Sequence, residues 1–169
     1  MELRKITQLS MLLSLGVVLN IVENLFPVLG GQIPGMKIGI ANVVILFTLY
    51  TYGLKDALTL SVLRVFLVGI LLTGIFSPTF FFSISGALLS ILMMYLVKKV
   101  TNLSIIGVSI IGAISHSLGQ VLMAIVILNT DSIIYYLPWL LIVSIPSGII
   151  IGIMSKYMLN HLKIYCQMI

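Results

Sequence analysis

The sequence predicts an all-α membrane protein: one domain, residues 1–169, folded as a bundle of six transmembrane helices. Hydrophobic residues make up 60% of the chain and charged residues only 8%, whereas soluble proteins average about 25% charged residues. No soluble core of this size hides so much apolar surface, so the solvent is lipid. The alternation of a membrane β-barrel is absent, and lipid-exposed strands would leave backbone groups unpaired, so the spans are helices.

Six apolar stretches follow one another, and the connections between them are short except the first. Each approaches the ~20 residues that a helix needs to cross a bilayer. Arg4 and Lys5 before the first stretch resemble the start of a secretory signal. That stretch is long for such a signal, however, and no A-x-A-like cleavage site follows, so we expect an uncleaved first span. The predicted spans are residues 6–27, 36–52, 57–74, 79–97, 104–128 and 133–159.

The basic residues predict the orientation of the bundle. With six crossings, seven of them fall on one side and only Lys37 on the other. The positive-inside rule then places both termini in the cytoplasm, and Tyr135, Tyr136 and Trp139 at the outer interface. The seven are Arg4, Lys5, Lys55, Lys98, Lys99, Lys156 and Lys163.

Glycine and proline mark the first connection and several packing positions. Residues 27–35 are too rich in both to continue a helix, and they form either a cover over a cavity or a plain turn. Pairs of small residues four apart let helix backbones approach closely. Pro138 and Pro146 predict bends in the last span. The small pairs are Ser10 and Ser14, Gly86 and Ser90, and Gly148 and Gly152.

One cation lies in the middle of an otherwise apolar span. Arg64 would sit near mid-membrane, where an arginine is unfavourable by roughly 2.5–3.5 kcal/mol and faces a protein interior or a wet cavity. Two interpretations are open, which do not exclude each other. Arg64 pairs structurally with a carboxylate such as Glu23, or it holds a ligand.

Polar side chains from other spans fall in the same layer of the membrane. Gly112, His116 and Gln120 are spaced at i, i+4 and i+8, so they share one helical face. Polar groups in hydrocarbon are unfavourable, so their concentration at one depth predicts a hydrated pocket open to the outside. The candidate binding residues are Glu23, Asn42, Arg64, His116 and Gln120.

The chemistry of this set predicts a small amphipathic ligand with an anionic or polar head. The Arg64 guanidinium is a planar donor fork that suits carboxylate or phosphate, and His116 donates or accepts near neutral pH. Three alternatives stay open. His116 is hydrogen-bonded to a neighbouring helix, Asn42 and Gln120 join helices, or the whole protein is a scaffold that binds no ligand.

The same sequence argues against catalysis, metal binding and nucleic-acid binding. The four acidic residues are not clustered, and no D-D-x-x-D, G-x-S-x-G, H-E-x-x-H or phosphate-binding G-x-x-x-x-G-K-[ST] motif is present. Cys166 is a lone cysteine. The basic residues lie at the ends of the spans rather than among exposed aromatics, so nucleic acid is not expected. We therefore expect no catalytic residues, metal or cofactor.

Four segments together resemble one family. They are ENLFP (Glu23–Pro27), PGMKIGIAN (Pro34–Asn42), LRV (Leu63–Val65) and IGAISHSLGQ (Ile111–Gln120). The chain, from about residue 6 to 155, resembles the small membrane proteins called Gx transporters, also labelled heptaprenyl diphosphate synthase component I. That family is similar in architecture to the S components of energy-coupling factor (ECF) transporters.

The resemblance implies a non-enzymatic protein of the cell membrane. It implies a substrate-binding subunit for uptake of a small amphipathic or anionic metabolite, working with an ECF coupling subunit and ATPases. S components often carry A-x-x-x-A in the first helix as the contact for the coupling subunit. Here Ser10 and Ser14 stand at that spacing and are the candidate partner contacts. The synthase label implies the alternative, an accessory membrane subunit of heptaprenyl diphosphate or isoprenoid-quinone biosynthesis.

Overall fold

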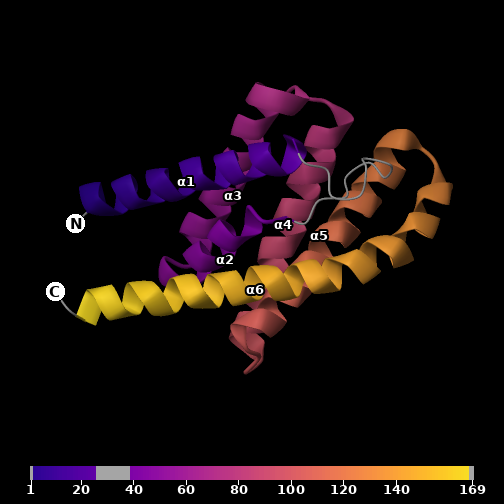
Figure 1. Cartoon of the computed structure of the whole chain (residues 1–169). Coiled ribbons are helices and arrows are strands. Elements are labelled where there is room, and N and C mark those ends of the chain that lie inside the picture. Colours follow the sequence, from indigo (N-terminus) through magenta and orange to yellow (C-terminus); the bar gives the residue numbers. More distant parts are fainter. Residues whose placement is uncertain (1, 26–38, 168–169) are drawn as a thin grey trace.

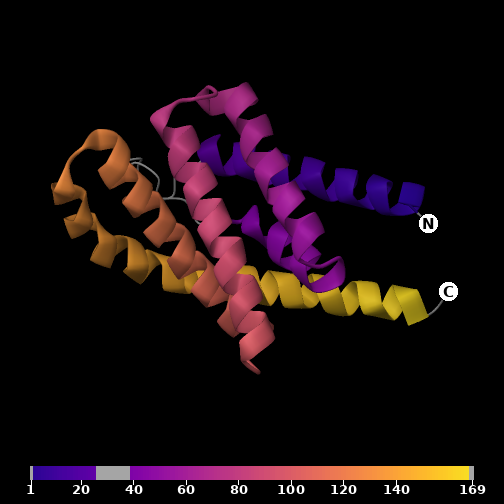
Figure 2. The same ribbon diagram turned by 180° about the vertical axis from the view of Figure 1, so that it is seen from behind.

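The computed structural model describes residues 2–25 and 39–167, and within them every regular element is a helix. In chain order these are α1 (Glu2–Leu25), α2 (Asn42–Thr51), α3 (Leu54–Val68), a π-helical turn η1 (Gly69–Thr73), α4 (Pro78–Val100), α5 (Ile105–Leu128), a 3-10 helix η2 (Asp131–Tyr136) and α6 (Leu137–Gln167). The start of α1 and the end of α6 lie on the same side of the bundle (Figures 1 and 2). The number of crossings and the cytoplasmic orientation of the termini stay predictions.

Among these residues, five helices are long and apolar enough to cross a membrane, which fits a multi-pass membrane protein. They match the first, third, fourth, fifth and sixth predicted spans to within a few residues at most ends. The largest difference is in the last span, because α6 continues to Gln167 and a 3-10 turn precedes it. Tyr135, Tyr136 and Trp139 are exposed, and η2 lies at the end of the bundle away from the termini (Figure 1).

The second span differs from its prediction. We predicted residues 36–52, but the helix begins at Asn42, and residues 36–38 lie outside the described part of the chain. Gly39 has a φ of +76°, and a turn follows in which the Asn42 amide donates to the Gly39 carbonyl at 2.7 Å. The ten residues of α2 rise about 15 Å, half the thickness of the hydrocarbon core. This helix therefore does not cross the membrane by itself.

The short helix α2 forms the centre of the bundle. Every residue from Val43 to Leu49 is buried, and α2 contacts α1, α3, α4 and α6. Ser155 of α6 donates to the Val43 carbonyl at 3.2 Å. A helix enclosed on all faces is apolar all round, as the sequence NVVILFTLYT is.

The C-terminal end of α2 is capped by a lysine of α4. The amides of Tyr52 and Gly53 both donate to the Thr48 carbonyl, so the Leu49 carbonyl is left without its usual backbone donor. Lys98 Nζ donates to that Leu49 oxygen at 2.9 Å and lies 4.3 Å from the centre of the Tyr50 ring. A cation at the C-terminus of a helix also complements the helix dipole.

Replacing Lys98 with methionine is therefore expected to lower the free energy of unfolding by about 1–3 kcal/mol, because a buried carbonyl loses its only side-chain donor described here. Lys99 is the matched control, since it is the next residue, carries the same charge and is exposed. Lys99→Met should change stability by less than about 0.5 kcal/mol. Thermal unfolding in detergent measures both, and equal losses in the two variants would contradict the capping role.

Small residues bring α5 into close contact with both of its neighbours. A Cβ added at Gly119 of α5 would lie 2.9 Å from the Gly86 Cα of α4, and one added at Gly148 of α6 would lie 2.7 Å from the Ile110 Cα of α5. Ser90 of α4 donates to the Gly112 carbonyl across the same α4–α5 contact at 2.8 Å. The Gly86/Ser90 and Gly148/Gly152 pairs therefore serve packing within one chain.

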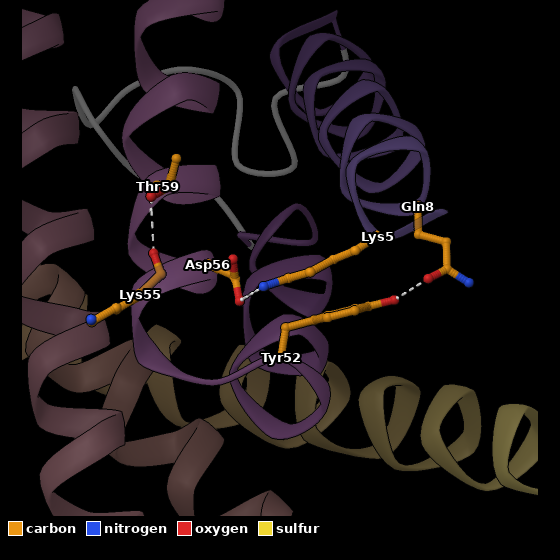
Figure 3. Close-up of polar contacts among 6 residues, drawn as sticks. All are labelled: Lys5, Gln8, Tyr52, Lys55, Asp56 and Thr59. Atoms are coloured by element: carbon orange, nitrogen blue, oxygen red, sulfur yellow. Dashed lines mark hydrogen bonds and ion pairs between the residues drawn. The ribbon is translucent and has the colours of Figure 1, made fainter. Parts of the chain in front are cut away.

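The end of α1 nearest the N-terminus is tied to the turn between α2 and α3 (Figure 3). Lys5 Nζ and Asp56 Oδ2 form an ion pair at 2.8 Å, and the Tyr52 hydroxyl donates to Gln8 Oε1 at 2.8 Å. Both contacts are partly exposed, so each contributes at most about 1 kcal/mol. They fix the position of α1, which is the least buried of the five long helices.

Candidate functional site

A cavity of about 60 Å³ lies where all six helices meet, which leaves room for a few water molecules. Polar side chains gather on its wall from α1, α2, α3, α4, α5 and α6, and apolar residues fill the gaps between them. Its polar lining includes Asn20, Asn42, Arg64, Thr73, Ser83, His116, Ser117, Gln120, Ser144 and Ser147.

Arg64 is the charged group of this cavity. Its side chain is only 4% exposed, and its Nη2 donates to Asn42 Oδ1 at 3.0 Å. No acceptor in the described part of the chain lies within hydrogen-bonding distance of Arg64 Nε, which is also buried. A buried guanidinium is stable only when opposite charge and hydrogen bonds offset its loss of hydration. Arg64 Nε is therefore a buried donor without an acceptor in the described residues, while Arg64 as a whole lines the cavity.

Glu23 supplies the opposite charge from the end of α1. Its side chain is 8% exposed, and its negative charge attracts Arg64. One carboxylate oxygen, Oε1, accepts a hydrogen bond from the backbone amide of Gly39. Glu23 therefore links the end of α1 to the turn that starts α2. The attraction between Glu23 and Arg64 is compatible with both interpretations of Arg64, which stay open.

His116 and Gln120 project from α5 toward the same cavity. Both are half-buried and line it, as the shared helical face predicts. The α4 backbone packs tightly beside them, since a Cβ at Gly86 would lie 2.8 Å from the His116 carbonyl oxygen and 2.9 Å from Gln120 Cγ. The third member of that face, Gly112, instead packs against Met94 and Ser90. On this face of α5, His116 and Gln120 therefore line the cavity, whereas Gly112 packs against α4.

Four of the five predicted binding residues therefore line one cavity, and Glu23 lies beside it through its bond to the lining residue Gly39. That they bind a ligand stays a prediction. The sequence interpretation missed Ser117 and Ser147, because serines in apolar helices more often serve packing. Ser144 also lines the cavity, and its hydroxyl lies 2.6 Å from that of Ser117.

A comparison with protein families agrees with the motifs around these residues. The family model for heptaprenyl diphosphate synthase component I matches residues 12–158, which include every predicted binding residue. The chain belongs to this family. No curated protein and no solved structure matched.

The described acidic side chains of this chain do not form a metal-binding group. A prenyl diphosphate synthase needs clustered carboxylates to hold magnesium and diphosphate. Within residues 2–25 and 39–167, no group of three or more His, Cys, Asp or Glu side chains is placed to hold a metal ion. Glu23 stands at the end of α1, whereas Asp56 lies at the start of α3 beside Lys5.

The predicted partner contacts of the component I chain lie on its surface. Ser10 and Ser14 are exposed on α1, and the Ser14 hydroxyl donates to the Ser10 carbonyl at 3.0 Å. Ser10 also lines a shallow groove between α1 and α3 whose walls are mostly leucine and isoleucine. The helix face is accessible, and the partner stays a prediction.

Proposed function

We propose that this protein is the non-catalytic membrane component of heptaprenyl diphosphate synthesis and works in the cell membrane with a separate, soluble catalytic chain. The observation that carries the proposal is the family match over residues 12–158. The composition supports it, because only four acidic residues occur and they are not clustered. The carboxylates that bind magnesium and diphosphate must then come from the partner.

A membrane component has a physical task in such a reaction. The polyprenyl tail of the product is apolar and leaves water favourably, at about 0.8 kcal/mol for each buried CH₂ group. A catalytic chain held against the bilayer releases this tail directly into lipid. The five long apolar helices supply the anchor for that arrangement.

The test is co-expression with an aspartate-rich prenyl diphosphate synthase chain from the same source. We expect the tagged membrane protein to co-purify with that chain, and heptaprenyl diphosphate to form only when both are present. Full synthesis by the soluble chain alone, with no co-purification, would contradict the proposal.

One observation favours a second function, the uptake of a small amphipathic or anionic metabolite. A buried arginine with an unused donor beside a cavity is an arrangement that binding sites within membranes use. In this hypothesis the chain is a substrate-binding subunit, energised by separate ECF-type coupling and ATPase subunits, and Ser10 and Ser14 face the coupling subunit. Co-purification with ATPase subunits instead of a synthase distinguishes the two functions.

A further inference from the structure

We propose that the cavity beside Arg64 binds a monocarboxylate with a short apolar body, and that it excludes a diphosphate head with its magnesium ion. The proposal rests on the cavity being a ligand site, which the uptake function requires and the synthase function permits. It assigns the ligand class from charge, donor geometry and volume.

The charged side chains of the site favour a ligand that carries a single negative charge. Among the described lining residues, Arg64 is the permanently charged side chain, and the neighbouring Glu23 already opposes it. A carboxylate adds one negative charge, which Arg64 shares with Glu23 and which the polar side chains of α5 help to solvate. A diphosphate adds about three, and proteins balance those with magnesium and several cations. No described cluster of side chains supplies the metal ligands.

The donors of the site suit a planar head. Asn42 Oδ1 holds Nη2 of the guanidinium, so the plane of the fork is fixed while Nε–H has no acceptor in the described chain. Arg64 lines the cavity, so a carboxylate there binds its guanidinium in the in-plane geometry that arginine and carboxylate prefer. Asn42 is also the first residue of α2, so the positive end of that helix dipole faces the same space.

The apolar wall and the volume of the cavity indicate the size and polarity of the remainder of the ligand. The cavity of about 60 Å³ accommodates a carboxylate head, and the rest of the ligand extends along the apolar side chains of the wall. Apolar side chains surround the polar wall and leave space for a short alkyl or similar body. They are Val65, Val68, Phe80, Leu140, Val143 and Ile151.

Four probes with one tail and different heads test the proposal on the whole chain in lipid nanodiscs. They are octanoate, octyl phosphate, octyl diphosphate with Mg²⁺, and octanol, and the readout is the shift in thermal unfolding as each is titrated. We expect octanoate to stabilise the protein at concentrations at least tenfold lower than the other three. Equal stabilisation by octanol, tighter binding of either phosphate probe, or no stabilisation by octanoate would overturn the proposal.

Two variants tie the effect to the site. Asn42→Ala keeps the Arg64 charge and removes the contact that orients it, so we expect octanoate affinity to fall on the order of tenfold. Leu122→Ala is the control, because Leu122 is exposed on the outer surface of α5 and should leave the affinity unchanged. Equal loss in both variants would contradict the assignment to this cavity.

A further experiment tests whether the carboxylate ligand enters from the bilayer or from water. Palmitate partitions into the bilayer, whereas octanoate also reaches the site from water. We expect octanoate to bind and palmitate to fail, because the apolar side chains around the polar wall accommodate only a short chain. Preferential binding of palmitate would overturn the short apolar body. If octanoate does not bind, the proposal that the protein co-purifies with a synthase is unaffected. If the protein does not co-purify with a synthase, the proposal of octanoate binding is unaffected.

Discussion

Arg64→Leu is expected to abolish binding of octanoate while the protein still inserts into the membrane and folds. The substitution removes the charge and the donor fork together, and a buried hydrogen-bonded charge pair contributes about 2–5 kcal/mol when one partner is lost. That loss corresponds to a fall in affinity of roughly 30-fold or more. Titration in nanodiscs measures the affinity, and size-exclusion chromatography confirms the folded state.

Arg64→Lys is the matched control for this prediction. It keeps one positive charge and loses the planar fork, so the affinity should fall on the order of tenfold rather than vanish. An unchanged affinity in Arg64→Leu would remove the cavity as the ligand site. Equal affinities in the leucine and lysine variants would show that charge has no part in recognition.

Glu23→Ala is expected to be the most destabilising single substitution near the site, by about 3–5 kcal/mol, because it leaves the Arg64 charge buried without its counter-charge. It also removes the acceptor of the Gly39 amide and so frees the end of α1 from the start of α2. Glu23→Gln should lose less stability, since its amide oxygen still accepts that hydrogen bond. Thermal unfolding in detergent measures both variants.

The same pair of variants distinguishes the two roles of Glu23. Removing its negative charge takes away the group that competes with an anionic ligand for Arg64. Glu23→Gln is therefore expected to bind octanoate more tightly than the original protein, although it is less stable. Equal stability of the alanine and glutamine variants would contradict the hydrogen bond to Gly39 as a stabilising contact.

Helix geometry alone was sufficient to predict that four polar residues from different helices lie close together. A helix rises ~1.5 Å per residue, so the position of a polar residue within a span gives its depth. Asn42, Arg64, His116 and Gln120 fall at matching depths, and the structure places all four on one cavity. The family motifs around them are confirmed by the match over residues 12–158. Helix depth says nothing of which residues face a neighbour, so Ser117 and Ser147 were missed.

The features that the sequence did not predict depend on tertiary contacts. Mostly apolar residues extend from Met36 through Tyr52, so the hydropathy of the sequence does not show that α2 begins at Asn42. The turn at Gly39 becomes favourable because Glu23, sixteen residues earlier, accepts its amide. From the sequence, Lys98 was used only to predict the membrane orientation. It caps the end of α2 because α4 passes that end in the folded structure.

Ligand binding at Arg64 requires a water-filled cavity that is reached from the outside of the membrane. Cysteine labelling measures this directly, after Cys166, the lone cysteine of the chain, is replaced with serine. Ser83→Cys places a thiol of nearly the same size on the cavity wall, and Leu122→Cys places one on the lipid-facing surface of α5. A membrane-impermeant thiol reagent added outside intact cells should modify the cysteine at 83 and spare the one at 122. Labelling of position 83 only from the cytoplasmic side, or from neither side, would contradict the account.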